Sequence, residues 1–431
     1  NLALLPDSVV RPRYDRGSAG CGIVHLGIGA FHRAHQAVFT DEAMNRSGGD
    51  WCITGVSMRS DSVARELRPQ DCLYSVLSED RQHRELRVIG AVKQVLVAPR
   101  ERQAVLDVLA AATTHIVTLT ITEKGYCQQA GGGGLDLAHP DIAADITDPR
   151  QPRSAIGLLA LALALRAAGD AGPLTVISCD NLAENGRVLQ HALSGYLAAA
   201  FPEARPWVAA NVAFPCSMVD RIVPAATPAQ RARQSELLGC KDTGGITTEP
   251  FSQWIIEDRF TTERPDWVAA GVQLVEDIRP YEELKLRLLN ASHSAIAYSG
   301  LLTGHDTVDQ VVADPALGSF VCRLMDEDLI PSLEVPVDFN LPAYRDALVT
   351  RFTNPCLGHR CSQIAMDGSE KIRQRWLPTL QLGRCPLLLQ ALAVWCRFVL
   401  ATDLALEDPR SEQLLALRNG PPEPGLSAAL A

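Results

Sequence analysis

The chain has 431 residues, of which 47% are hydrophobic and 21% are charged, and its formal net charge is −10. This length allows two or three domains with an ample core, and the composition is typical of a folded globular protein. The negative charge argues against a nucleic-acid partner, which would require a basic surface.

No segment predicts a membrane span or secretion. The most apolar stretch, GLLALALALRAAG at 157–169, is shorter than the roughly 20 residues that cross a bilayer, so we expect a buried helix there. The N-terminus shows no signal-peptide pattern, and it also lacks an initiator methionine. The 12 cysteines include no C-x-x-C pair, which indicates reduced thiols and predicts a cytoplasmic protein.

Strand-like and helix-like segments alternate through the first half of the chain. The expected strands are 23–27, 51–57, 86–91, 115–122, 174–179 and 208–214. This alternation predicts an α/β domain with a mainly parallel sheet over residues 1–275. Apolar residues at helical spacing then dominate, at 282–304, 316–330, 342–352 and 384–402, so we expect a mainly α-helical second domain over 276–431.

A glycine turn follows the first expected strand. After IVHL the sequence continues Gly27-Ile28-Gly29, where the backbone could approach a pyrophosphate and the next helix could point its N–H groups at the phosphates. Alone this is a weak signal, because an ordinary turn or a histidine metal site would fit as well. Its place at the start of a βαβ array favours a dinucleotide.

The residues after the first two strands refine this hypothesis. His32 and His35 are three residues apart, but no carboxylate or thiolate with ligand spacing accompanies them. We therefore expect no metal site and interpret them as surface or capping histidines at a helix start. Asp61, after the second strand, could accept hydrogen bonds from an adenosine ribose and favours NAD, whereas Arg59 nearby could instead accept the 2′-phosphate of NADP.

The segment EELKLRLLNASHS carries candidate acid–base residues. On an α-helix, Lys285, Asn290 and His293 would lie at about 0°, 140° and 80° around the axis and share one broad face. A lysine among leucines is costly to bury as an ammonium, so its pKa should fall toward neutrality, as suits a general base. Asn290 could donate to a developing alkoxide, and His293 could orient the substrate. The alternative is a lysine that reaches solvent beside a core asparagine and histidine.

Two expected strands end in polar residues. Asp180 and Asn181 follow the strand at 174–179, and Asp220 and Arg221 follow the strand expected at 208–214. Ligands gather at the carboxyl ends of strands in open α/β sheets. The same residue types also form simple turns, so this pattern leaves both interpretations open.

Together these segments resemble the polyol-specific long-chain dehydrogenase family, which includes mannitol 2-dehydrogenase, fructuronate reductase and tagaturonate reductase. The similar segments are GIGAFHRAHQA, TLTITEKGYC, VISCDNLAENG, FPCSMVDRIVPAATP, EPFSQWIIED, EELKLRLLNASHS and QIAMDGSEK, in family order from about residue 20 to 400. The resemblance implies a Rossmann-type N-terminal domain, a helical C-terminal domain, a cleft between them, a nicotinamide cofactor and no metal.

The resemblance also implies roles for the matching residues. Catalytic roles fall to Lys285 as general base, Asn181 and Asn290 as oxyanion-hole donors, Asp220 and His293 as positioning groups, and Glu282 as proton relay. Cofactor-binding positions are Gly27, Gly29, Phe31, Asp61 and Asn181, and Glu123 and Lys371 fall at substrate positions. The chain departs from the family in a shortened join around 377–398 and in ending soon after residue 419.

The substrate class follows from charge. Mannonate and fructuronate differ from mannitol and fructose by a carboxylate, which calls for a cationic partner. Lys124 stands where mannitol dehydrogenases tend to have glycine, Arg360 offers a second cation, and Gln363 stands where the mannitol type tends to have arginine. We expect D-mannonate and D-fructuronate, with mannitol or another polyol as the alternative. A non-catalytic NAD(H) sensor is a remote alternative, since the lysine and both asparagines are present. The expected partner is a small-molecule substrate, and the expected state is a monomer or small homo-oligomer.

Overall fold

The computed structural model describes residues 2–129, 134–335, 339–401 and 406–416. It divides into two compact units, one made of residues 1–79 and 83–278 and the other of residues 80–82 and 279–431. Each unit is described by itself below. Among the described residues, no helix is both long enough and apolar enough to cross a membrane.

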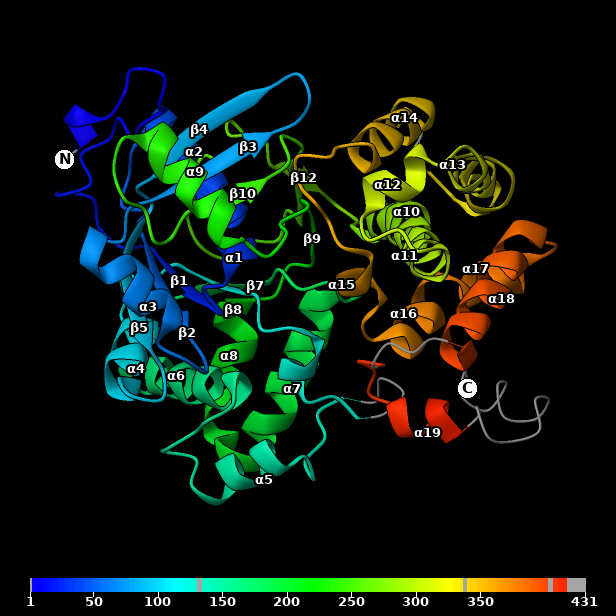
Figure 1. Ribbon diagram of the computed structural model, residues 1–431. Coiled ribbons are helices and arrows are strands. Elements are labelled where there is room, and N and C mark those ends of the chain that lie inside the picture. The colour runs from blue at the N-terminus through cyan, green and yellow to red at the C-terminus, as the bar shows by residue number, and fades with distance from the viewer. Residues whose placement is uncertain (1, 130–133, 336–338, 402–405, 417–431) are drawn as a thin grey trace. The chain divides into compact units, whose positions relative to one another are not determined.

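The first unit is built on a six-stranded parallel sheet (Figure 1). Its strands, in spatial order, are β5 (Val92–Val97), β2 (Ile53–Ser57), β1 (Ile23–Leu26), β6 (Ile116–Leu119), β7 (Leu174–Ser178) and β8 (Val212–Ala213). The chain order reverses beside β1, because β2 lies on one side of it and β6 on the other. Ligands of doubly wound sheets bind at this kind of switch point, outside the carboxyl ends of the strands.

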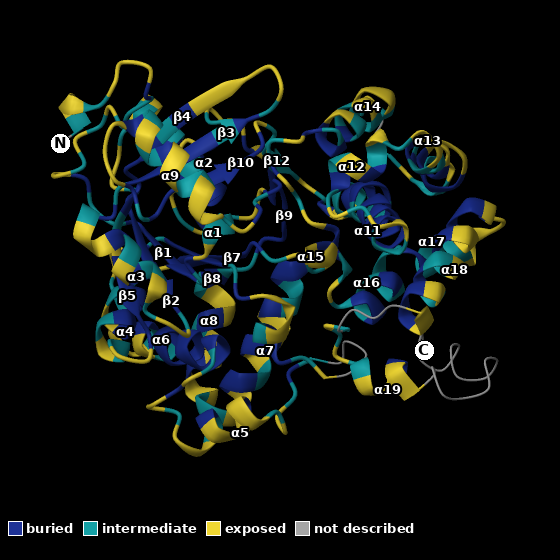
Figure 2. Cartoon of the chain, viewed as in Figure 1, coloured by how far each residue is buried: buried dark blue, intermediate teal, exposed yellow. Residues whose placement is uncertain are grey.

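Helices of the first unit cover the six-stranded sheet, with two exceptions. They are α1 (Ala30–Ala34), α2 (Gln36–Ser47), α3 (Ser62–Leu67), α4 (Arg102–Ala110), α5 (Pro140–Thr147), α6 (Ala155–Gly169), α7 (Asn185–Ala200), α8 (Arg205–Asn211) and α9 (Pro228–Leu238). The exceptions are α9, which packs on the smaller sheet of β3 (Tyr74–Glu79), β4 (Arg84–Ile89) and β10 (Ile246–Thr248), and α5, which packs on other helices. Figure 2 shows buried residues along the strands and exposed residues on outer helices such as α5 and α9. The stretch expected to be a buried helix is α6, which is buried from Ala155 to Leu163.

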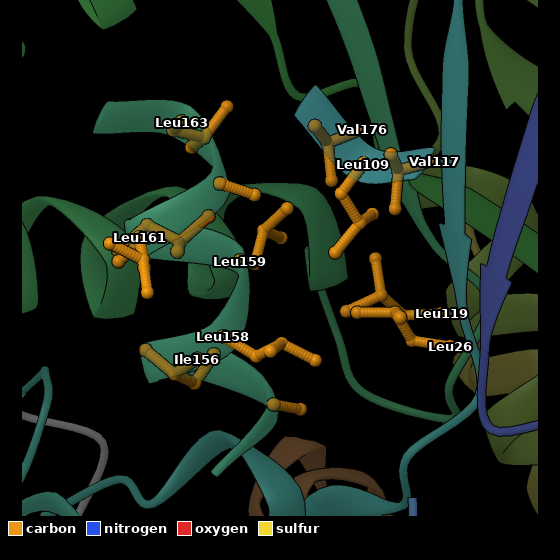
Figure 3. Packing of buried hydrophobic residues seen from close by; sticks show 14 of the residues in the cluster. Leu26, Leu109, Val117, Leu119, Ile156, Leu158, Leu159, Leu161, Leu163 and Val176 are labelled. Carbon is orange, nitrogen blue, oxygen red and sulfur yellow. The ribbon is translucent and has the colours of Figure 1, made fainter. Parts of the chain in front are cut away.

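The core between α6 and the sheet consists of leucine and valine side chains. Leu26, Val117 and Leu119 from the strands belong to one buried cluster with Leu109 of α4 and Leu159 of α6 (Figure 3). Each of these five side chains is fully buried, so burial contributes roughly 1.5–3 kcal/mol for each one. This core holds the sheet in place, and the sheet in turn positions the loops at its edge.

One expected strand forms but joins another sheet, and a second is mostly helical. Residues 86–91 do not join the parallel sheet, because they form most of β4 (Arg84–Ile89), antiparallel to β3 (Tyr74–Glu79), and β5 takes the expected place. Residues 208–211 belong to α8, and only Val212 and Ala213 pair in the sheet. The remaining strands β10 (Ile246–Thr248), β9 (Ser217–Asp220), β11 (Gln253–Glu257) and β12 (Gln273–Val275) form small sheets that sequence reasoning missed.

The second unit is helical throughout its described residues, as expected. Its helices are α10 (Arg279–Leu284), α11 (Ala291–Thr303), α12 (Val308–Ala313), α13 (Pro315–Arg323), α14 (Leu341–Phe352), α15 (Cys361–Ala365), α16 (Gly368–Arg375), α17 (Leu377–Leu382), α18 (Pro386–Ala401) and α19 (Ser411–Ala416). Helix α11 is buried from Ala291 to Gly300. Two π-helical segments, Lys285–Asn290 and Leu324–Leu329, interrupt the α-helices.

Candidate active site

The turn after β1 requires glycine at position 27. Gly27 has φ +96°, a left-handed value, and an added Cβ would lie 2.0 Å from the carbonyl oxygen of Thr120. Its N–H donates to the carbonyl of Val56 at 2.8 Å. The turn is therefore pressed against the ends of β2 and β6, and no side chain fits there.

Gly29 has no such reason to be glycine. Its φ is −86°, which any residue adopts, and the nearest atom to an added Cβ is the carbonyl oxygen of Gly27 at 3.8 Å. The space beside the Gly29 Cα is open, which leaves its backbone accessible to a ligand. Helix α1 is only five residues long, so its dipole is weaker than the sequence suggested, but its first N–H groups still have no partner within the helix.

The two histidines after the turn are buried packing residues, so their interpretation as surface or capping groups was wrong. The His32 ring stacks on His25 at a centroid distance of 3.4 Å, and burial lowers the pKa of His32 well below 6.5. His35 occupies the N-cap position of α2 but forms no side-chain cap, and its Nε2 lies 2.9 Å from the carbonyl oxygen of Gln253. Within the described residues, no group of three His, Cys, Asp or Glu could hold a metal ion.

Asp61 lies at the N-cap position of α3, just past β2, and is held by arginines. Its carboxylate accepts a hydrogen bond from Arg100 at 2.6 Å and lies 3.3 Å from Arg65. Arg59, the residue that made the cofactor preference ambiguous, is exposed. Phe31 is partly buried and stacks on His35 at 5.0 Å.

The carboxyl ends of β6 and β7 carry the next candidates. Asn181 is exposed directly beyond β7, and Glu123 and Lys124 are exposed in a short 3-10 helix beyond β6. Asp180 has a different role, because its carboxylate accepts hydrogen bonds from the backbone N–H groups of Ile121 and Thr122 at 3.0 and 2.8 Å. Burial raises the pKa of Asp180 to about 6.

Asp220 is the last residue of β9 and is buried, not part of a turn after β8. It pairs with Gln253 in the antiparallel β9–β11 ladder. Its neighbour Arg221 is also buried, and its guanidinium donates to the carbonyl oxygen of Glu249 at 2.9 Å and to that of Ala34. Arg221 therefore serves the packing of the first unit.

In the second unit, Lys285 begins a π-helical turn that runs to Asn290 (called the π turn below). The N–H of Ala291 donates to the carbonyl of Leu286, five residues earlier. Because π-helical hydrogen bonds join residues five apart, Asn290 lies about one turn beyond Lys285. The sequence predicted one broad α-helical face for these residues, and the π turn brings Asn290 nearer to the lysine around the axis than α-helical geometry would.

The π turn begins with a buried lysine and ends with a partly buried asparagine. Lys285 is buried, with 8% of its surface exposed, and Asn290 is partly buried. Glu282, partly buried in α10, precedes Lys285 by three residues and so lies toward the same side of the helix. The alternative of a lysine that reaches bulk solvent does not fit this burial.

His293 lies one turn further along, in α11. Its ring packs against Phe352 at 4.8 Å and edge-on against His359 at 5.5 Å. Burial lowers the pKa of His293 well below 6.5, and His359, Arg351, Arg375 and Lys285 lower it further. His293 is therefore a neutral imidazole in a positively charged environment.

Sequence reasoning did not single out Arg375 and Trp376, which clamp the end of the π turn. Arg375 donates to the carbonyl oxygen of Asn290 and to Ser294 Oγ, each at 3.0 Å, and Trp376 Nε1 donates to the carbonyl oxygen of Ala291 at 3.1 Å. Two successive side chains thus bind two successive carbonyls. The only sequence signal was an aromatic and a cation after DGSEK.

The two remaining candidates differ in burial. Lys371, partly buried in α16, donates from Nζ to the carbonyl oxygen of Ile364 at 3.1 Å. Burial and, to a smaller extent, the charge of Lys371 together lower the pKa of His359 to about 4. Arg360 is exposed at the start of α15, and its backbone forms a bridge with Thr307.

The fold and these residues define a class of protein. A parallel sheet with a dinucleotide-type glycine turn, joined in one chain to a helical unit with a buried lysine, is the organisation of a two-domain Rossmann-type dehydrogenase. Residues 21–269 match the model of the mannitol dehydrogenase Rossmann domain, and residues 277–419 match that of the mannitol dehydrogenase C-terminal domain. The chain belongs to the mannitol dehydrogenase family.

Individual relatives agree with this assignment. D-mannonate oxidoreductase of Escherichia coli is 43% identical over 92% of this chain and 83% of its own length, and mannitol 2-dehydrogenase of Aspergillus terreus is 38% identical over 95% and 86%. A solved structure of Pseudomonas fluorescens mannitol 2-dehydrogenase with NAD and D-mannitol superposes with a TM-score of 0.91, at 36% identity over 97% of this chain and 88% of that one.

The predicted family, the α/β plus helical fold class and the dehydrogenase class acting on CH–OH groups are confirmed by these comparisons. The prediction of a nicotinamide cofactor is confirmed at the level of the family. The relatives divide between a mannonate and a mannitol enzyme, so they support a polyol or sugar-acid oxidoreductase without choosing between the two.

Proposed function

We propose that this chain interconverts D-mannonate and D-fructuronate with NAD as cofactor. The observation that supports the chemistry is the π turn, which begins at the buried Lys285 and ends at Asn290 about one turn further on. An amine kept from water is a poor site for a permanent positive charge and a good proton acceptor.

Each residue then has a task in alcohol oxidation. The amine of Lys285 takes the hydroxyl proton, and the amides of Asn181 and Asn290 donate hydrogen bonds to the alkoxide that forms. Neutral His293 and buried Asp220 hold the substrate and the lysine in position. Glu282, three residues before the lysine, relays the proton onward. The nicotinamide, when bound, supplies the hydride acceptor.

The glycine turn is the proposed cofactor site. Gly27 brings the backbone close to the ends of its neighbouring strands, and the open space at Gly29 admits the pyrophosphate. Phe31 and Asn181 complete the nicotinamide side of the site, and Asp61 accepts hydrogen bonds from the ribose, which favours NAD. NADP remains the alternative, because Arg65 and Arg100 lie against the Asp61 carboxylate and could bind a 2′-phosphate.

The preference for a sugar acid rests on positive charge. Arg351 and Arg375 act on His293, and Lys371 acts on neighbouring His359, so the helical unit offers three cations near one buried ring pair besides the proposed base. A carboxylate substrate would be stabilised there, whereas a neutral polyol would gain little. Lys124, Arg360 and Glu123 are proposed as further substrate contacts. The alternative substrate pair is D-mannitol and D-fructose, favoured by the similarity to mannitol 2-dehydrogenases.

We also propose a cytoplasmic enzyme. All twelve cysteines are free, and eight of them are held within or against the buried cores, as expected of thiols in a reducing compartment.

Initial rates with fructuronate and fructose, each with NADH and with NADPH, test the substrate and cofactor together. We expect kcat/KM for fructuronate with NADH to exceed that for fructose by at least about tenfold, the value of one charge-assisted contact. Lys371→Met should remove most of this preference, while Arg373→Met, two residues along the same helix, should preserve it. A preference of the parent for fructose would contradict the sugar-acid proposal.

A further inference from the structure

The backbone just beyond β6 is strained at a position next to the proposed substrate contacts. Thr122 has φ +65° and ψ 161°, a region that is essentially restricted to glycine. Threonine is β-branched, which makes this conformation harder still to adopt. Such strain persists only where surrounding contacts enforce it, and Thr122 immediately precedes Glu123 and Lys124.

One carboxylate supplies those contacts. Asp180 Oδ1 accepts the N–H of Thr122 at 2.8 Å, and Oδ2 accepts the N–H of Ile121 at 3.0 Å and the hydroxyl of Tyr126 at 2.8 Å. Tyr126 is fully buried, so the third donor is fixed in the core. The three donors thus surround both oxygens of a single side chain, which charge-assisted hydrogen bonding stabilises.

The backbone of Asp180 is anchored as well. Its carbonyl oxygen accepts the side-chain amide of Asn185 at 3.0 Å, and Asn185 also exchanges two hydrogen bonds with the backbone of Ser217. Because Asn181 follows directly, the anchor fixes the base of that residue too. Asp180 therefore ties the ends of β6, β7 and β9 together.

We propose that Asp180 is a positioning residue, whose carboxylate holds the strained Ile121–Thr122 turn and so presents Glu123, Lys124 and Asn181 at one edge of the sheet. The claim that the carboxylate holds the turn rests on the hydrogen-bond geometry alone. The effect on substrate rests on the proposed function.

The isosteric variant Asp180→Asn tests the proposal. An amide has one acceptor oxygen, so it can bind the Ile121 N–H and Tyr126 but must turn its own NH₂ toward the N–H of Thr122. Tyr126→Phe is the matched control, because it removes one donor from the same carboxylate and leaves both backbone bonds in place. Thr122→Gly is the rescue, because glycine adopts the strained conformation without cost.

Hydrogen exchange at the amides of Ile121 and Thr122 measures how well Asp180 holds the turn, and it requires no substrate. We expect Asp180→Asn to raise exchange at the Thr122 amide by at least about tenfold, as the loss of one bond to a charged group implies, with a smaller rise at Ile121, whose acceptor oxygen is kept. Tyr126→Phe should leave both amides protected. Unchanged exchange in Asp180→Asn would overturn the proposal, whatever the enzyme turns over.

Steady-state kinetics report the positioning. We expect Asp180→Asn to raise the substrate KM about tenfold with a smaller change in kcat and in NADH affinity, and Thr122→Gly in the same chain to restore KM to within about threefold. A purely structural role would lower thermal stability and leave KM unmoved, and that result would overturn the positioning. A parent without turnover on any sugar would contradict the proposed function. The hydrogen-exchange experiment would still test whether Asp180 holds the turn.

Discussion

Two glycines two residues apart should respond to alanine in opposite ways. At Gly27 the added methyl would lie 2.0 Å from the Thr120 carbonyl oxygen, and φ is +96°. The clash and the left-handed backbone together should cost about 2–5 kcal/mol of unfolding free energy. At Gly29 the methyl meets nothing closer than 3.8 Å and φ is −86°, so Gly29→Ala should be neutral or should stabilise by about 0.4–1 kcal/mol.

The Gly29→Ala variant should bind NADH more weakly than the parent even though its stability is unchanged or higher. The space that an alanine methyl fills at position 29 is the space proposed for the pyrophosphate. Overpacking of about 1–3 kcal/mol would weaken NADH binding by about 5–150-fold in an otherwise intact protein. Urea unfolding measures the first effect, and fluorescence titration with NADH measures the second.

Either half of this comparison can refute the reasoning. If Gly29→Ala binds NADH as tightly as the parent, the dinucleotide does not lie over the open side of the turn. If Gly27→Ala is as stable as the parent, the contact between the turn and Thr120 is not as close as the structure shows.

Two further predictions concern the clamp on the π turn and a buried carboxyl. Arg375→Met removes the donor to the carbonyl of Asn290, so kcat should fall about tenfold while Arg373→Met leaves it unchanged; equal kcat in both variants would contradict the clamp. Burial raises the pKa of Asp41 from 3.8 to about 6, so this group favours the folded state below pH 4 and that contribution is lost as pH rises to 6. The difference in unfolding free energy between Asp41→Asn and the parent should therefore shift by about 2 kcal/mol toward the variant between pH 4 and pH 7. A difference that does not change with pH in urea unfolding would contradict the raised pKa.

The sequence predicted the parts of the fold that depend on hydrophobic patterning. Alternating apolar strands and amphipathic helices indicated the parallel sheet, and the long apolar run at 157–169 is the buried helix α6. The pattern failed where two adjacent apolar runs competed, since residues 86–91 and 92–97 look alike and only pairing in the folded chain separates β4 from β5. The stretch 208–214 was expected to be a strand, but α8 begins at Arg205 and includes residues 208–211.

The candidate residues were found by type, by spacing and, for several of them, only by the family resemblance, but their geometry was not predicted. A 3.6-residue period describes an α-helix and gives no sign of a π turn, so the alignment of Lys285 with Asn290 could not be read from the sequence. His32 and His35 were interpreted as surface or capping groups from their position at a helix start, yet both are buried and the His32 ring stacks on His25. Asp180 looked like a turn residue, and its three donors come from positions about 55–60 residues away in sequence.

The variant Lys285→Ala tests the central claim most directly, when its turnover, its NADH affinity and its response to added amines are measured together. The account predicts that turnover falls by about 10²–10⁴-fold, that NADH binds within twofold of the parent, and that methylamine or ethylamine restores part of the rate in proportion to its free-base concentration. A variant that keeps the parental kcat, or that loses NADH binding together with turnover, would contradict the assignment of Lys285 as the general base.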